Sequence, residues 1–341
     1  MDIKAKGFVS AETVARLAGV SRSAVSRTFT DGASVSEATR KKVLEAADAL
    51  GYHVNHLARG LSHDRSNIIG IIVSEIPTPY QARMLDEMTR QLQVIGKVGM
   101  VINTTGDQES VANALRQTLN FRADGVIVLS GTPDASLIAS CVANGQRVIL
   151  INRSDHIEGP ANLAVENAET AREAYHLLRR AGCQRLAVVS STAGTPSLTA
   201  RDSAFVAAAQ EDGLSVPIIR AGPTGYAAGA EAARQLYGRS GGPDGVFGVT
   251  DLLALGFMDA ARHAFGLRVP QDVSIVGFDD IEQAGWESYA LTTFRQPVEE
   301  MVEHIMQLLS QAGPDEWAHT VPPIKPIPIW RKSVLPRPGA A

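Results

Sequence analysis

The sequence contains few cysteines and no long apolar segment. Only Cys141 and Cys183 occur in its 341 residues, and neither has the neighbours of a metal-binding motif. We expect two reduced thiols in or near the core of a cytoplasmic protein. No apolar run is long enough to cross a bilayer, and the first residues turn polar before the apolar stretch of a signal peptide could form. These absences predict a protein with no metal site and no contact with a membrane.

Signature motifs of several enzyme classes are also absent. The sequence has no P-loop, no G-x-S-x-G or H-E-x-x-H motif, and no G-x-G-x-x-G after its first predicted strand. The neighbouring acids Asp279 and Asp280 could take part in acid chemistry, but no base, nucleophile or metal ligand accompanies them. We therefore predict a binding protein that is not an enzyme and needs no cofactor.

The charge of the chain is unevenly distributed. The whole sequence has a net charge of −4, but residues 1–65 contain ten lysines and arginines against seven acids. The charge is therefore +3 over this segment and −7 over the rest. A basic amino-terminal segment on an acidic body directs the attraction for phosphates to that segment, and it disfavours contact between the body and nucleic acid.

Residues 1–54, which we call the head, contain three short helical patterns. Each pattern begins after a serine suited to cap a helix, and the first and third end at a glycine. The predicted caps are Ser10, Ser21 and Ser36, and the glycines are Gly19 and Gly51. Apolar residues recur at helical spacing in all three patterns, at Val14, Leu17 and Ala18, at Val25 and Phe29, and at Val43, Ala46, Ala47 and Leu50. Two capped helices separated by A-G-V-S are typical of a helix-turn-helix.

The second of these helices has an outer face suited to DNA. When Val25 and Phe29 face inward, the outer face carries Arg22, Ser23, Ser26 and Arg27. A slim cationic helix of this kind fits a major groove, where arginine pairs with guanine and serine reaches bases or phosphates. The alternative is an ordinary solvated helix with two arginines.

The head resembles a known family. The segments TVARLAGVSRSAVSR, VSEATRKKVLEAADALGY and NHLARGL follow, in order and spacing, the amino-terminal signature of the LacI/GalR repressors. The resemblance continues more loosely over nearly the whole chain. It implies that Arg22 and Ser23 read bases at the start of the recognition helix. It also implies that Ser10, Ser21, Ser26 and Arg27 contact phosphates or neighbouring bases.

Residues 55–66 form a predicted hinge between the head and the body. Asn55 could cap a single helix over 56–61, which is too short to be stable without a partner. The resemblance implies a hinge helix that docks in the minor groove, where Leu61 wedges between base pairs and Ala58 and Arg59 line the groove. Val54 stands where the family usually has proline, so folding of the hinge should depend more heavily on DNA. The alternative is a disordered linker.

From residue 67 onward, apolar strand patterns alternate with helical ones. This alternation predicts parallel sheets covered on both faces. The fold class is therefore α/β, with a small all-α helix-turn-helix head plus two doubly wound parallel-sheet subdomains of the periplasmic-binding-protein type. The predicted boundaries are 1–54 for the head, 55–66 for the hinge and 67–341 for the body, in which one subdomain takes about 67–165 and 296–325 and the other about 166–295 and 326–341. Residues 326–333 are expected to supply a last strand to the second of these subdomains.

The loops that follow the strands of the body are the expected ligand site, because such sheets bind ligands outside the carboxyl ends of their strands. These loops carry arginine, carboxylates and an aromatic ring, which together suit a sugar. By position in the family pattern, the effector contacts would be Arg201, Asp279, Thr250 and Asp251, with Asn152, Arg153, Ser197 and Gln296 as further candidates and Tyr80 at the mouth of the cleft. For each of them the alternative is a structural hydrogen bond at the end of a strand.

These observations predict a transcription regulator, of the repressor type, that binds a palindromic operator as a homodimer. A tail without leucine heptads favours a dimer over a tetramer. The expected effector is a sugar or a sugar acid, and the two arginines Arg153 and Arg201 favour the acid. The alternatives are a sugar-binding protein of the transport type and a sugar-modifying enzyme on the same fold. The first would need an export signal and no DNA-binding head.

Overall fold

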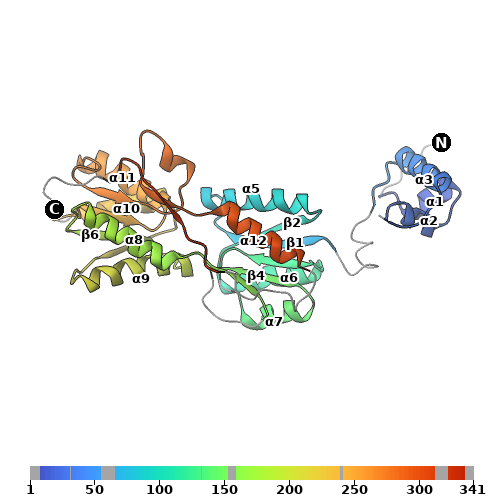
Figure 1. Cartoon of the computed structure of the whole chain (residues 1–341), viewed down its shortest axis with the longest axis horizontal. Coiled ribbons are helices and arrows are strands. Elements are labelled where there is room, and N and C mark those ends of the chain that lie inside the picture. The colour runs from blue at the N-terminus through green and yellow to red at the C-terminus, as the bar shows by residue number, and fades with distance from the viewer. Residues whose placement is uncertain are drawn as a thin grey trace. The chain divides into compact units, whose positions relative to one another are not determined.

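The computed structural model describes residues 8–30, 32–54, 66–131, 133–152, 159–238, 241–311 and 322–334. The chain divides into two compact units, 1–66 and 67–341 (Figure 1). Within the described ranges, no helix has the length and apolar character needed to span a membrane.

The head contains three helices around a small apolar core. They are α1 (Ala11–Ala18), α2 (Arg22–Thr28) and α3 (Glu37–Leu50). The hydroxyls of the three predicted caps, Ser10, Ser21 and Ser36, accept hydrogen bonds from the third backbone N–H that follows. Gly19 and Gly51 end α1 and α3 in the left-handed conformation that glycine tolerates best. The boundaries predicted from capping residues are therefore confirmed.

Packing in the head agrees with the predicted apolar pattern except at one position. Val14, Val25 and Val43, one from each helix, are fully buried together. Leu17 is 56% exposed, so the prediction that it faces inward is wrong. Arg40 of α3 donates a hydrogen bond of 2.9 Å to the carbonyl of Thr28 and so fixes the end of α2. This arrangement holds α2 in place by its inner face and leaves its outer face open.

The first subdomain is the part of the body built on a five-stranded parallel sheet of order β2-β1-β3-β4-β5. Its strands are β1 (Ile68–Ser74), β2 (Val98–Thr104), β3 (Gly125–Val128), β4 (Arg147–Ile151) and β5 (Ala161–Leu163). Its helices are α5 (Pro79–Val94), α6 (Gln108–Asn120), α7 (Ala135–Ala143) and α12 (Val298–Ser310). Alternate residues of β1 face opposite layers: Ile69 and Ile71 pack with α5 and α12, and Ile72 packs with α6 and α7.

The second subdomain is built on a four-stranded parallel sheet of order β7-β6-β8-β9. Its strands are β6 (Leu186–Ser191), β7 (Ile218–Ala221), β8 (Gly245–Gly248) and β9 (Ser274–Val276). Its helices are α8 (Asn167–Arg180), α9 (Pro196–Glu211), α10 (Tyr226–Tyr237), α11 (Asp251–Phe265) and the 3-10 turn η1 (Glu282–Gly285). Helices lie on both faces of this sheet (Figure 1). Together the two subdomains confirm the α/β fold class.

The carboxyl-terminal strand differs from expectation. Residues 326–333 were predicted to supply a last strand to the second subdomain, but the strand is only β11 (Ile327–Ile329). It pairs antiparallel with β10 (Thr293–Arg295) in a separate two-stranded sheet, not with the parallel strands. Each of these two segments runs from one subdomain to the other, so β10 and β11 lie side by side (Figure 1).

Candidate functional site

The outer face of α2 is the candidate DNA-reading surface. Arg22, Ser23, Ser26 and Arg27 are all exposed, as predicted, whereas Ala24 and Val25 on the opposite face are buried. The Arg27 Nε donates to the Ser23 carbonyl over 3.4 Å, so this side chain lies along the helix. The surface thus presents two guanidinium groups and two hydroxyls on one rigid helix.

Ser10 and Ser21 lie at the amino ends of α1 and α2. The Ser10 hydroxyl accepts a hydrogen bond of 3.2 Å from the Thr13 N–H, and the Ser21 hydroxyl accepts one of 3.2 Å from the Ala24 N–H. They therefore act as helix caps in the free protein, and their exposed positions remain compatible with a phosphate contact. The predicted hinge contacts Asn55, Ala58, Arg59 and Leu61 lie outside the described residues.

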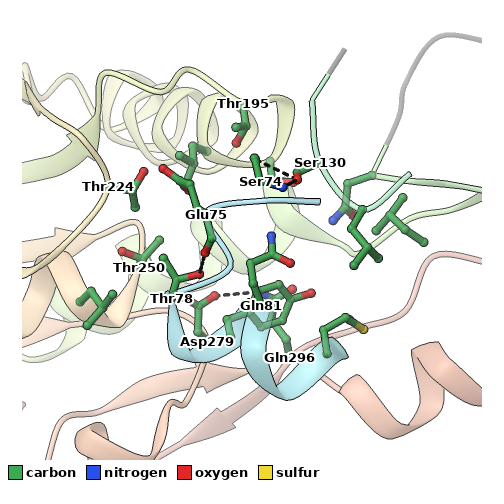
Figure 2. Close-up of a pocket in the computed structure, with 18 of the residues that line it drawn as sticks. Ser74, Glu75, Thr78, Gln81, Ser130, Thr195, Thr224, Thr250, Asp279 and Gln296 are labelled. Carbon is green, nitrogen blue, oxygen red and sulfur yellow. Dashed lines mark hydrogen bonds between the residues drawn. The ribbon is translucent and has the colours of Figure 1, made fainter. Parts of the chain in front are cut away.

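The body has a pocket where the carboxyl ends of strands from both subdomains meet (Figure 2). The space between its lining residues amounts to about 970 Å³, a volume that includes open solvent. Seven of the predicted effector residues line it, namely Tyr80, Asn152, Ser197, Arg201, Thr250, Asp279 and Gln296. Arg153 lies outside the described residues. The prediction placed these side chains around one cavity, and the structure does so.

A buried ion pair forms the floor of the pocket. Arg201 of α9 is 3% exposed, and its Nη1 lies 3.5 Å from Oδ1 of Asp279. The same guanidinium donates to Oδ1 of Asn167 and to the carbonyl of Val249, each over 2.8 Å. It also stacks 3.5 Å above the ring of Phe278. Arg201 is thus fixed by four partners before any ligand arrives.

Asp279 has an unusual backbone and an unusual pKa. Its φ of 125° lies in a region that L-residues rarely adopt, which is typical of functional sites. Its Oδ1 accepts a hydrogen bond of 2.6 Å from Nε2 of Gln296. Burial raises the pKa of Asp279 to about 6, while the charge of Arg201 opposes that rise. The side-chain oxygen Oε1 of Gln296 is buried and has no hydrogen-bond partner among the described residues, so it is available to a ligand donor.

Asp251, a predicted effector contact, lies behind the pocket and not on its lining. Its Oδ2 accepts from the Ile281 N–H over 2.9 Å, and its Oδ1 accepts from the Thr293 hydroxyl over 2.5 Å. Burial, followed by the nearby charge of Asp279, raises the pKa of Asp251 to about 7. A Cβ at position 277 would lie 2.2 Å from the Asp251 Oδ1, so glycine there leaves room for this carboxyl. Asp251 therefore positions the loop that carries Asp279.

Two other predicted contacts also make structural hydrogen bonds. Asn152, with φ of 55°, accepts from the Val165 N–H over 2.8 Å. Thr250 caps α11 by accepting from the Leu253 N–H. Both side chains still line the pocket, so the structural role and the proposed binding role coexist. Tyr80 is half-buried, and its hydroxyl group donates to the sulfur of Met301 over 3.9 Å. Desolvation raises the pKa of Tyr80, which keeps the hydroxyl a neutral donor.

Sequence reasoning missed several polar lining residues, above all Glu75 and Gln81. Glu75 directly follows β1, and this position at the end of a strand was the one signal that could have identified it. Sequence reasoning located the end of this strand but singled out only Tyr80 in the loop that follows. Asn167 was also missed: it lies at the start of α8, and its role in orienting Arg201 depends on a contact across 34 residues. Among the described lining residues, the charged side chains are the carboxylates of Glu75 and Asp279 and the guanidinium of Arg201.

Comparison with known proteins adds a family signal for each unit. Residues 10–55 match the model of the bacterial regulatory proteins of the lacI family, and residues 175–334 match a periplasmic binding protein-like domain. Catabolite control protein A of Priestia megaterium is 30% identical over 305 residues, which cover 87% of this chain and 90% of that protein.

Solved structures show the same architecture. A Lac repressor dimer bound to operator and the anti-inducer ONPF superposes with a TM-score of 0.83 at 23% identity, over 96% of this chain and all of the other. The transcriptional regulator CelR in complex with cellobiose gives a TM-score of 0.69 at 26% identity, over 95% of this chain and 99% of the other.

Proposed function

Because this chain belongs to the lacI family of bacterial regulatory proteins and is a DNA-binding transcription regulator with an effector-binding domain, we propose that it is a cytoplasmic repressor that binds a palindromic operator as a homodimer. A sugar or sugar derivative in the pocket of the body is the proposed effector, meaning the small molecule that changes the affinity for DNA.

One observation carries the DNA-binding part of this proposal: a short capped helix, α2, exposes Arg22, Ser23, Ser26 and Arg27 while its other face is buried. Helices of this kind place their first residues against base edges, where an arginine pairs with O6 and N7 of guanine. Contacts with phosphates supply much of the affinity but do not distinguish one base sequence from another. Arg22 and Arg27 can therefore differ in role, one reading a base and the other binding a phosphate.

The test is selection of a DNA site from a random pool by the full-length chain, followed by measured affinities. We expect a palindromic consensus, because a twofold dimer presents two heads. Replacement Arg22→Ala should weaken specific binding about 5- to 150-fold and relax the preference at one base pair of each half-site, while binding to unrelated DNA changes little. Arg180→Ala, a change of an arginine in α8 of the body, is the matched control. Equal losses on specific and unrelated DNA would contradict a reading role for Arg22.

The homodimer is supported by an apolar patch at one edge of the first subdomain. Strand β2 is the last strand of its sheet, and Val98 and Val101 on it are 63% and 43% exposed. Val94 and Ile95, just before the strand, are exposed as well. An exposed apolar strand edge is typical of an interface. A second copy of the chain is its proposed occupant, and the Lac repressor that superposes on this chain is a dimer.

Charges placed on this edge should separate the protomers. We expect the double variant Val98→Lys, Val101→Lys to be mainly monomeric at micromolar concentration in analytical ultracentrifugation, because four like charges would meet across a twofold interface. Leu44→Lys, a change of an equally exposed leucine in the head, should leave the dimer intact. A double variant that stays dimeric would place the interface elsewhere.

The ligand part of the proposal depends on the pocket. Its polar groups come from the ends of strands in both subdomains, so a ligand there contacts both and favours one relative arrangement of them. The complex of CelR with cellobiose supports a sugar as the class of ligand. A thermal-shift screen with sugars and sugar derivatives tests this, because a ligand at a hundredfold excess over its Kd adds about 2.7 kcal/mol of stability.

A further inference from the structure

Glu75 is held with its carboxylate inside the pocket. It follows β1 with φ of 56°, and both the backbone N–H and the hydroxyl of Thr78 donate to its carbonyl oxygen over 2.9 Å. This tight turn fixes the backbone and directs the side chain away from the sheet. Figure 2 shows the carboxylate extending toward Thr224, which comes from the other subdomain. Glu75 is therefore a rigidly mounted acid that faces across the cavity.

The partner of Glu75 belongs to a short chain of hydroxyl groups. The Ala193 N–H donates to Oγ of Ser191 over 3.1 Å, and the Ser191 and Thr224 hydroxyls are 2.7 Å apart. Interaction with the Thr224 hydroxyl lowers the pKa of Glu75, although burial raises this pKa by more. A single hydroxyl is weak compensation for a half-buried carboxylate, because a carboxylate can accept several hydrogen bonds.

The rest of the pocket also offers hydrogen-bond acceptors. The buried side-chain oxygen Oε1 of Gln296 has no partner in the described part of the chain, and Asp279 is a second carboxylate. Arg201 is the only cation among the described lining residues, and its guanidinium is already engaged by Asp279, Asn167 and the Val249 carbonyl. A ligand that donates hydrogen bonds gains from these groups, whereas an anion next to Glu75 meets a like charge.

We propose that Glu75 is a specificity-determining residue of the effector pocket, which accepts a hydrogen bond from a hydroxyl or ammonium group of a neutral or cationic sugar and excludes sugar acids. The inference rests on the proposed sugar-responsive function and narrows its ligand class. It replaces the preference for an acid that the two arginines suggested from sequence, because the acid at position 75 offsets the charge of Arg201. The donor group of the ligand binds the Glu75 carboxylate either together with the Thr224 hydroxyl or in its place.

Titration calorimetry on the full chain at pH 7.5 tests this assignment. The probes are D-glucose, D-galactose and D-ribose as neutral sugars, D-glucosamine and D-galactosamine as cationic ones, and D-gluconate, D-glucuronate and D-galacturonate as acids. The proteins are the wild type, Glu75→Gln, which keeps the shape and removes the charge, and Glu109→Gln, which removes an exposed carboxylate of the same subdomain. Circular dichroism checks that the variants are folded.

We expect the wild type to bind at least one neutral or cationic sugar and none of the acids. Glu75→Gln should weaken binding of a cationic sugar 10-fold or more, weaken a neutral one less, and raise the affinity for the matching acid, while Glu109→Gln changes nothing. Tight binding of an acid by the wild type, or identical affinities in the wild type and Glu75→Gln, would overturn the role of Glu75 and leave the sugar-responsive function standing. Binding of no probe by the wild type would contradict that function and the role of Glu75 together.

Discussion

Replacement of Arg201 by alanine is expected to abolish ligand binding and to lower the free energy of unfolding of the body by about 3–5 kcal/mol. The reason is that the guanidinium group is almost completely buried. It is held by Asp279, Asn167, the Val249 carbonyl and the ring of Phe278. Without it, the Asp279 carboxylate remains buried with no opposing charge. Chemical unfolding monitored by circular dichroism gives the stability, and calorimetry gives the ligand affinity.

Two variants separate the buried pair from general effects of losing an arginine. Arg268→Ala removes an exposed ion pair with Asp272 and should cost no more than about 1 kcal/mol. Arg201→Lys keeps the charge but loses the planar fork, so we expect a folded protein whose ligand affinity falls at least about 10-fold. If Arg201→Ala were as stable as Arg268→Ala, the buried pair would not be an important part of the fold.

The ligand-free body is expected to lose stability as the pH rises from about 4 to about 8. Burial raises the pKa values of Asp251 and Asp279 to about 7 and about 6, above those of carboxyls in an unfolded chain. The folded protein therefore holds protons that the unfolded chain releases. This contribution is fully present below pH 4 and disappears as the pH rises through 6 and 7, by an amount of the order of a few kcal/mol. Denaturant unfolding across this range measures it.

Asparagine at position 251 isolates the titration from other effects of pH. Asp251→Asn keeps an acceptor for the Ile281 N–H and offers an N–H₂ group to the Thr293 hydroxyl, so both present partners can be retained. We expect this variant to be more stable than the wild type above pH 7 and less dependent on pH. Asp86→Asn, a change of an exposed acid on α5, should follow the wild type. Parallel curves for wild type and Asp251→Asn would refute the raised pKa.

Local signals in the sequence predicted the head well. Serine caps and left-handed glycines depend on the adjacent backbone alone, so Ser10, Ser21, Gly19 and Gly51 were identified correctly. Leu17 was placed inside because helical spacing identifies a stripe of apolar residues but not its width. The roles of Ser23 and Arg27 toward DNA stay predictions, because the free head shows only that they are exposed.

The body shows where sequence reasoning is insufficient. Strand ends located the pocket, since parallel strands place their following loops at one edge. They could not tell which of two adjacent residues faces the ligand: Thr250 lines the pocket, whereas Asp251 turns inward to hold the loop of Asp279. Glu75 and Asn167 were missed because their importance depends on partners far away in the sequence, Thr224 and Arg201.

Coupling between the pocket and the head is the central claim, and one titration tests it most directly. The affinity of the full-length chain for its selected operator is measured by fluorescence anisotropy, without and with a saturating amount of the sugar that stabilises the protein. We predict a change of about 5- to 150-fold in the Kd for operator, the usual range for a switch of this kind. In Arg201→Lys the same change should require at least about 10-fold more sugar. An unchanged Kd with the wild-type pocket saturated would show that the ligand does not regulate DNA binding.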